Sequence, residues 1–206
     1  MQETELSWLT QAQNGDSQAF TYLVETYQRP VYNLCYRMLM NAEDAEDASQ
    51  ETFLRAYKAL RRYDNSRSFS TWLLSIAAHY CIDQIRKRRY KVVSIEDLPL
   101  PDLPDKSQGI ETRLSIKEEQ QKIQTMLNIL DPVDRAAVVM YYWYDFSYDE
   151  ICQTLSLTNS AIKSRLHRAR KAMANEWLKN QTQKKAASQQ VASGQKENFI
   201  VERIMP

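Results

Sequence analysis

The chain has 206 residues, of which 43% are hydrophobic, and this length allows one large or two small domains with cores of their own. No apolar run approaches membrane-spanning length and no signal peptide is evident, so we expect a soluble, cytoplasmic protein without membrane insertion. The net charge of +1 hides a strong polarisation, because residues 43–51 hold five acids and residues 86–91 hold five bases. Such blocks indicate one basic and one anionic partner, although mutual salt bridges within the fold would also explain them.

Helical periodicity is the dominant pattern of the sequence. Only three glycines are present, alternating strand patterns are missing, and apolar residues recur at helical spacing. The sequence therefore predicts an all-α fold of two small helical domains, residues 1–91 and 113–180, joined by an extended acidic linker over 92–112. Residues 181–206 are too polar to bury a core and are predicted to be a disordered tail, whose last residues are either a docking peptide or an inert end.

The three cysteines indicate core thiols and not a catalytic or metal centre. Cys35, Cys81 and Cys152 are widely spaced and lie among apolar residues, which favours reduced thiols over disulfides. His79 and Cys81 are two positions apart and diverge on a helix. We therefore expect no metal site and no cofactor.

Four helices are predicted in the first domain. Asp16 is a suitable N-cap for the first, and Pro30 is placed at the start of the second because proline is favoured in the first helical turn. The third is expected at about residues 43–60 and the fourth at about residues 70–89. Apolar stripes at helical spacing indicate that they share one compact core.

The third helix separates an apolar face from a polar one. The apolar side is lined by Ala45, Ala48, Thr52, Phe53, Ala56 and Leu60. The other sides hold Asp44, Asp47, Gln50, Glu51 and Leu54. Carboxylates on a helix surface lack the desolvated pocket that shifts catalytic pKa values. The polar side is therefore interpreted as a docking face for a basic partner.

Arginines alternate with aromatic residues directly after the third helix. The interleaved residues are Arg61, Arg62, Tyr63, Arg67, Phe69 and Trp72. This composition suits single-stranded nucleic acid, because bases stack on rings at ~1 to 3 kcal/mol each while guanidinium groups hold the backbone. The alternative is that the aromatic residues belong to the core. The fourth helix has a complete apolar stripe without them, over Leu74, Ala78, Cys81, Ile82 and Ile85. Its other face is left with Trp72, His79, Asp83 and Arg86.

The linker combines prolines with acidic side chains. Pro99, Pro101 and Pro104 exclude a continuous helix, and acids outnumber bases around them. Two interpretations remain open: a simple tether, or an acidic strand that threads a basic channel normally occupied by nucleic acid.

The second domain is predicted to end in two short helices around a tight turn. An earlier helix passes through residues 116–130, and Asp131 caps the one that follows it. Ser147 and Glu150 form a capping box for the first helix of the pair, and Thr158 caps the second.

The last of these helices is amphipathic and basic. Its buried stripe is predicted to be Ile162, Leu166, Ala169 and Met173. The remaining faces hold Ser160, Lys163, Ser164, Arg165, His167 and Arg168. Such side chains read base edges in a major groove and bind phosphates, so the pair is interpreted as a DNA-binding helix-turn-helix. A solvated run of charges is the alternative.

Three sequence blocks, taken in order, resemble an extracytoplasmic-function (ECF) sigma factor of the sigma-70 family. The first is DAEDASQETFLRAY, the second is FSTWLLSIA with IDQIRKRR, and the third is LDPVDR with SYDEICQTL and IKSRLHRAR. The resemblance covers about residues 10–178. It implies a subunit that recruits bacterial RNA polymerase core to promoters and starts strand opening, under the control of an anti-sigma factor.

The resemblance also assigns roles to positions. The first domain corresponds to region two, the second to region four, and the linker to the segment that approaches the polymerase active site. Contacts with the polymerase β′ clamp fall on Asp44, Asp47, Gln50, Glu51, Phe53 and Leu54, and region four is expected to meet the β flap. Minus-10 contacts fall on Arg61, Arg62, Arg67, Phe69, Trp72, His79, Asp83 and Arg86. Minus-35 contacts fall on Ser160, Lys163, Ser164, Arg165, His167 and Arg168.

Three positions depart from the family pattern. His79 stands where many members have Asn, Ser156 replaces the usual Gly of the helix-turn-helix turn, and Ser160-Ala161 replace a frequent Gly-Thr. A left-handed backbone at Ser156 would cost ~1 kcal/mol.

The sequence disfavours two other functional classes. A helix-turn-helix regulator that binds duplex DNA alone needs neither the acidic third helix nor the arginine-aromatic segment. A helical nuclease needs a metal-carboxylate or nucleophile constellation, and none is recognisable, so we expect no enzymatic activity.

Overall fold

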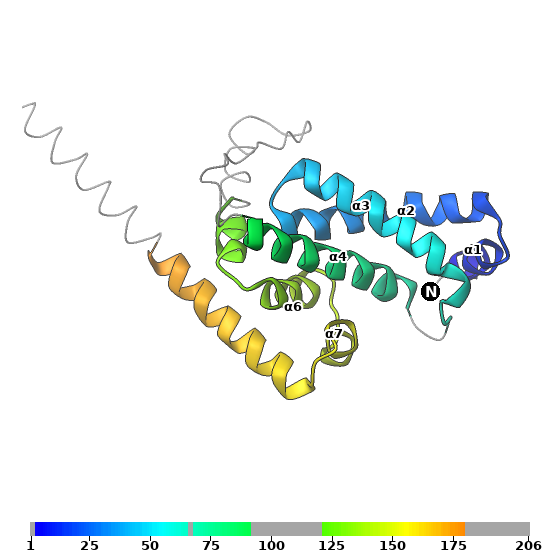
Figure 1. The fold of residues 1–206 in the computed structure, drawn as a ribbon. Helices are drawn as coiled ribbons and strands as arrows, with labels where there is room; N and C mark the ends of the chain where they lie inside the picture. The colour runs from blue at the N-terminus through cyan, green and yellow to red at the C-terminus, as the bar shows by residue number, and fades with distance from the viewer. Residues whose placement is uncertain (1–2, 66–67, 92–120, 180–206) are drawn as a thin grey trace, which may run out of the picture.

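The computed structural model describes residues 3–65, 68–91 and 121–179, and every regular element in these ranges is a helix (Figure 1). The predicted all-α fold is confirmed. The expected linker at 92–112 and the tail at 181–206 lie outside the described residues.

Four helices form the first unit. They are α1 (Glu3–Gln13), α2 (Ser17–Leu39), α3 (Ala42–Ala59) and α4 (Phe69–Lys91), with a 3-10 turn, η1, at Leu60–Arg62. Helices α2, α3 and α4 pack on one another, and α1 packs on α2. Their shared core contains Leu23, Leu34 and Met38 of α2, all fully buried.

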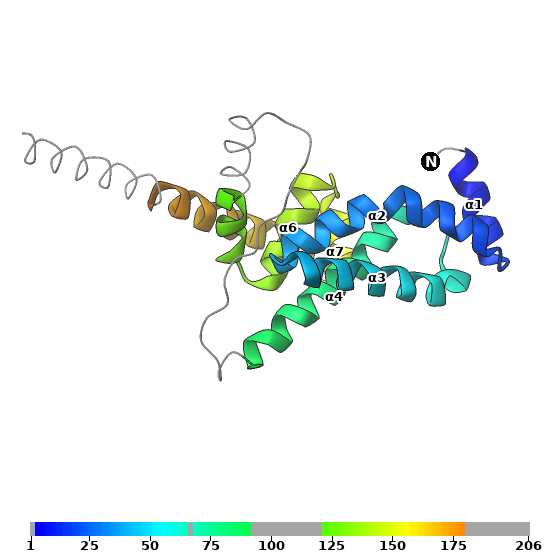
Figure 2. The same cartoon turned by 90° about the horizontal axis from the view of Figure 1, so that it is seen from above.

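The second unit lies against the first. It comprises a helix over residues 121–128, α6 (Pro132–Trp143), α7 (Tyr148–Leu155) and a helix over residues 159–179. Helix α6 packs on both α2 and α4, and α7 packs on α4. The second unit thus lies on the side of α4 away from α3 (Figure 1), and seen from above α2 and α3 lie over it (Figure 2). No helix in the described ranges is long and apolar enough to cross a membrane.

Two features of the first unit differ from the prediction. Helix α1 was not predicted, because it buries little beyond Leu9 and Ala12 and so lacks a broad apolar stripe. Pro30 lies inside α2 and does not start a new helix, so that prediction is wrong. Proline removes one helical hydrogen bond, but buried Leu23 and Val31 on either side hold the segment against the core.

The predicted helix caps are confirmed. Asp16 and Asp131 each accept a hydrogen bond from the amide two residues ahead, at 2.8 and 3.1 Å. Ser147 and Glu150 bond reciprocally as a capping box, and Thr158 accepts from the amide three residues ahead at 3.3 Å. Each cap satisfies amides that a helix start leaves without a partner.

The predicted apolar stripes are also confirmed, apart from their margins. Buried are Ala45, Ala48, Thr52, Ala56, Leu60, Leu74, Ala78, Cys81, Ile82, Ile162, Leu166 and Ala169. Phe53, Ile85 and Met173 are only partly buried and pack at the edge of the core. Cys35 and Cys81 are core thiols as expected, whereas Cys152 is half-buried.

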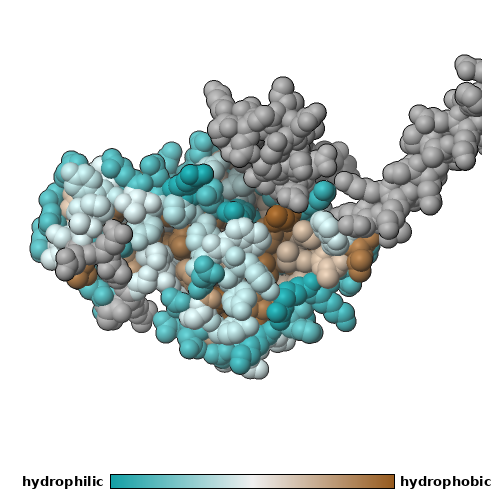
Figure 3. All heavy atoms as spheres, turned by 180° about the vertical axis from the view of Figure 1, so that it is seen from behind, coloured by the Kyte–Doolittle hydropathy of each residue, from teal (hydrophilic) through white to brown (hydrophobic). Residues whose placement is uncertain are grey.

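Apolar surface remains exposed on the second unit. Figure 3 shows the face opposite to that of Figure 1, where the largest hydrophobic patch lies over this unit and most of the rest is hydrophilic. Large exposed hydrophobic residues of the unit are Ile129, Tyr142, Trp177 and Leu178. These side chains form the apolar surface that the core of the unit leaves exposed.

Ser156 provides a test of the local backbone. It ends α7 in the left-handed conformation, with φ 53° and ψ 45°, where a side chain with a Cβ is strained. We expect Ser156→Gly to raise the free energy of unfolding by about 0.5 to 1 kcal/mol in urea titrations. Ser156→Ala keeps the Cβ and should bring no gain; an equal gain from alanine would rule out strain as the cause.

Candidate nucleic-acid and protein interfaces

The helix over residues 159–179 turns polar side chains to solvent along one face. Exposed on it are Ser160, Lys163, Ser164, His167 and Arg168. The buried stripe of the same helix packs into the core of the second unit. These five residues therefore lie together at the surface, as a helix that enters a DNA groove requires.

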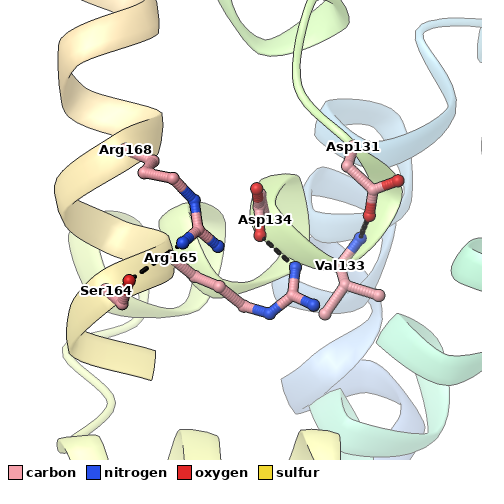
Figure 4. Close-up of polar contacts among 6 residues, drawn as sticks. All are labelled: Asp131, Val133, Asp134, Ser164, Arg165 and Arg168. Carbon is pink, nitrogen blue, oxygen red and sulfur yellow. Dashed lines mark hydrogen bonds and ion pairs between the residues drawn. The ribbon is translucent and has the colours of Figure 1, made fainter. Parts of the chain in front are cut away.

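Two of these cations are held by neighbouring side chains. The ammonium of Lys163 lies 5.8 Å from the centre of the Tyr148 ring. Arg168 Nη1 donates to Ser164 Oγ at 2.9 Å (Figure 4). Both contacts reduce side-chain freedom before any ligand binds, which lowers the entropic cost of binding.

Arg165 is engaged within the protein. Its Nη1 donates to Asp134 Oδ1 of α6 at 2.6 Å, and the two side chains are 29% and 16% exposed (Figure 4). An ion pair shielded in this way is screened less than one in open solvent. Arg165 thus ties the helix over residues 159–179, which we call the recognition helix after its predicted role, to α6, and the DNA contact predicted for Arg165 would require this pair to break.

An exposed ridge runs along α3. Asp47, Gln50 and Leu54 are exposed at positions i, i+3 and i+7, and Leu54 is 47% exposed. Tyr57, three residues further on, is equally exposed. An apolar side chain flanked by acidic and amide groups is a surface suited to a basic protein partner.

Two other acids of α3, Asp44 and Glu51, have partners inside the first unit. Asp44 pairs with Arg88 of α4, and Glu51 pairs with Arg55 at 2.7 Å. Asp44 belongs to the acidic block of the sequence and Arg88 to the basic block. The Asp44–Arg88 pair is therefore a salt bridge between the two blocks, as the alternative explanation of these blocks required.

The aromatic residues after α3 form one cluster. The rings of Tyr63, Phe69 and Trp72 lie 4.8 to 5.6 Å apart, and Tyr27 packs against Phe69 at 5.4 Å. Phe69 is 1% exposed, so its ring is not accessible to DNA in this conformation, and the contact predicted for it would require the cluster to open. The rings of Tyr27, Tyr63 and Trp72 enclose the ring of Phe69, which thereby supports Trp72. Burial raises the pKa of Tyr63 to about 12, so its hydroxyl stays neutral.

The remaining minus-10 candidates reach solvent where the structure describes them. Exposed are Arg61, Arg62, His79, Asp83 and Arg86, whereas Arg67 lies outside the described residues. His79 Nδ1 lies 2.8 Å from the carbonyl oxygen of Ser75. Because a carbonyl only accepts, this contact fits a histidine with its proton on Nδ1.

A cleft of about 320 Å³ lies beside the contact between α4 and α7. Trp72 and His79 line one wall, and Glu150 and Gln153 of α7 line the other. Thr71 donates a hydrogen bond to Glu150 across this cleft at 2.9 Å. Burial alone would raise the pKa of the Glu150 carboxyl, but its hydrogen bonds outweigh that effect and lower the pKa, so the group is anionic at neutral pH.

Comparison with known proteins decides the family. Residues 23–90 match the family described as Sigma-70 region 2, and residues 120–173 match Sigma-70, region 4. The chain is 34% identical to the ECF RNA polymerase sigma factor SigW of Bacillus subtilis (strain 168), over 82% of this chain and 94% of that one. The chain belongs to the sigma-70 family, as an ECF sigma factor. A second relative is the ECF RNA polymerase sigma factor SigE of Mycolicibacterium smegmatis, 31% identical over 78% of this chain and 62% of that protein.

Solved structures show the same fold. CnrH in complex with the cytosolic domain of CnrY matches with a TM-score of 0.62 at 24% identity, over 84% of this chain and 96% of that one. The sigma factor RpoE in complex with the anti-sigma factor NepR from Bartonella quintana matches with a TM-score of 0.62 at 21% identity, over 77% and 96%. The two family matches and the identity with SigW, not these structures, show that the chain directs RNA polymerase core to promoters, as the sequence resemblance implied.

The Asp134–Arg165 pair can be measured by a double-mutant cycle. We expect Asp134→Asn and Arg165→Ala each to destabilise the sigma factor, and the double variant to show a coupling of about 1 kcal/mol, because the pair is largely shielded. Urea unfolding of the four proteins gives this number. Arg168→Ala is the matched control, since that arginine is exposed and should change stability by no more than about 0.5 kcal/mol. A coupling near zero would mean that Arg165 does not position the helix.

Proposed function

We propose that residues 1–91 act as region two and that the exposed ridge on α3 binds the β′ clamp of RNA polymerase. The observation that carries this is the row of Asp47, Gln50 and Leu54, exposed on one helix whose opposite side is buried. Asp44, Glu51 and Phe53 flank the row and complete the contact. Acidic and amide groups select a basic surface, and Leu54 supplies apolar area.

Residues 113–180 act as region four. The exposed face of the helix over 159–179 reads the minus-35 element, with cations that also reach phosphates. The exposed apolar surface of this unit, which includes Ile129 and Leu178, supports a contact with the β flap. The segment 92–112 then passes from region two toward the polymerase active site.

The minus-10 element is read by the exposed side of α4 and the residues before it. Trp72 offers a ring on which an extruded base can stack, and Arg61, Arg62 and Arg86 offer charge for the backbone. His79 stands on the same side and presents its ring at the position where relatives carry an amide. Arg67 is included in this surface on sequence grounds.

The sigma factor supplies promoter recognition and strand opening, while the polymerase performs the chemistry. The sigma factor is therefore not itself an enzyme. It acts in the cytoplasm, where the polymerase is found. Its control by an anti-sigma factor is supported by two structural relatives, which were solved with CnrY and with the anti-sigma factor NepR.

Reconstitution tests the function directly. The purified chain with bacterial core polymerase should give promoter-specific transcripts, whereas the chain alone should bind the same DNA weakly. Tight and sequence-specific binding without core would instead favour a regulator that acts alone.

Charge reversal on α3 tests the polymerase contact. We expect Asp47→Arg to weaken core affinity about tenfold, because it places a cation against a basic surface. Fluorescence anisotropy with labelled sigma factor measures the affinity. Glu46→Arg makes the same charge change at the adjacent exposed position, outside the proposed ridge, and should have a much smaller effect. Equal effects would show that only net charge matters.

Truncation of one recognition-helix cation tests the minus-35 assignment. We expect Arg168→Ala to reduce discrimination among minus-35 sequences by about 1 to 3 kcal/mol while core affinity is unchanged. Competition among promoter variants in transcription assays measures this. Arg170→Ala, also exposed on this helix, should weaken binding to all sequences alike. If Arg168→Ala instead weakens core binding, the two surfaces have been exchanged.

A further inference from the structure

Helix α1 precedes residues 23–90, the range that matches region two, so that match assigns it no role. The helix packs on α2, and its Leu9 and Ala12 are buried. It also contacts η1, at the end of the first unit where α3 passes into α4 (Figure 1). This connection carries the arginines and aromatic residues that are proposed to meet the minus-10 strand. Helix α1 is therefore in a position to act on them.

Gln13, the last residue of α1, reaches this connection with its side-chain amide. Its Nε2 donates to the carbonyl oxygens of Leu60 and Tyr63, at 3.2 and 2.9 Å, and its Oε1 accepts from Asn65 Nδ2 at 3.2 Å. Leu60 is the first residue of η1 and Tyr63 follows the last one, so the two donated bonds brace the turn at both ends. Both the donor and the acceptor of the Gln13 amide are therefore used within one short segment of the backbone.

The end of α1 is itself held in place. Gly15, at φ 100°, turns the chain from α1 into α2 through a backbone conformation that residues with a Cβ rarely adopt. The amide of Asp16 donates to the carbonyl oxygen of Gln11 at 3.1 Å, and the carboxylate of Asp16 caps α2. Gln13 therefore braces the turn from a fixed point on the helix.

A second contact connects α1 to the aromatic cluster. Glu5 accepts a hydrogen bond from the hydroxyl of Tyr27 at 2.7 Å. The ring of Tyr27 packs on Phe69 at 5.4 Å between centres, and Phe69 packs on Trp72 at 5.6 Å. Burial and the Glu5 carboxylate raise the pKa of Tyr27, so its hydroxyl keeps the proton that it donates. Helix α1 thus supports the backbone that leads into the cluster and also one of the rings.

We propose that Gln13 is a positioning residue for minus-10 recognition. It holds residues 60–65 in the conformation that presents the arginines of η1 to the DNA strand. The same segment carries Tyr63, whose ring centre lies 4.8 Å from that of Trp72. Because a segment that is ordered in advance loses less entropy on binding, Gln13 strengthens capture of the single strand without contacting it. The inference rests on the proposed minus-10 surface and adds a residue from outside that surface.

Hydrogen exchange tests the bracing in the free, full-length chain. Gln13→Met keeps a long, uncharged side chain but removes the amide donor and acceptor. The amide of Tyr63, which donates to the carbonyl oxygen of Leu60 at 3.0 Å, should then exchange about five- to tenfold faster, because the turn opens more often. Gln11→Met makes the same change at an exposed position of α1, where the side chain donates to Ser7, and should leave this rate unchanged. An unchanged rate in Gln13→Met would overturn the proposal.

Strand capture by the holoenzyme tests the consequence. The probe is the single strand that spans the minus-10 element of a promoter transcribed by the reconstituted holoenzyme. We expect Gln13→Met to weaken binding of this strand about fivefold and to slow promoter opening by a similar factor. The affinities for core polymerase and for duplex DNA of the minus-35 element should be unchanged. A residue that merely stabilises the fold would lower all of these quantities together, so an equal loss in every assay would exclude the positioning role.

Trp72→Ala separates this inference from the function on which it rests. If Trp72→Ala weakens strand capture and Gln13→Met does not, the minus-10 surface stands and the positioning role fails. If Trp72→Ala leaves capture and opening unchanged, the minus-10 surface is wrong and the role of Gln13 fails with it. Weaker capture in both variants, with core affinity intact, supports the proposal.

Discussion

The packing of the two units depends on a guanidinium buried among carbonyl oxygens. Met38 lies in the last turn of α2, and Asn128 is the last residue of the helix over 121–128, so their carbonyls have no amide partner within their own helices. Arg135 donates to both, at 2.5 and 3.0 Å. One cation therefore caps two helix ends that belong to different units, where the helix dipoles also favour positive charge. Hydrogen bonds to a charged group contribute about 1.5 to 3 kcal/mol each. Arg135 therefore stabilises the interface between the units more than the surface area that it buries would suggest.

The sequence was most informative where structure is set within a few residues. The caps at Asp16, Asp131 and Ser147 were predictable, because a side-chain oxygen reaches amides two or three positions ahead whatever the rest of the fold does. The buried stripes were predictable for the same reason, since helical spacing alone places residues on one side. Most of the exposed candidates of α3 and of the recognition helix were predictable as well, because they are the residues that do not belong to a buried stripe.

Contacts between distant residues account for what the sequence did not reveal. Pro30 reads as a helix start, yet core packing on both sides carries the helix through it. Phe69 reads as a stacking surface for bases, but three other rings enclose it, one of them from α2. Arg165 is indistinguishable by spacing from the neighbouring cations, and only the fold brings Asp134 to it. Each of these depends on which helices become neighbours, and helical periodicity carries no information about that.

The same arrangement keeps opposite charges of one chain from neutralising each other. Asp44 and Arg88 do pair, but α3, which carries the ridge, and the helix over residues 159–179 lie on opposite sides of α4 and α6 in Figure 1. Helix α4 and parts of the second unit stand between them, and a helix with its side chains is about 10 Å wide. Exposed charges that lie further apart than the Debye length, about 8 Å at physiological salt, are largely screened by solvent ions, so the two surfaces interact only weakly. An acidic ridge can then hold a basic protein surface while a cationic helix a short distance away remains available for phosphates, which a chain of net charge +1 could not achieve with its charges intermixed.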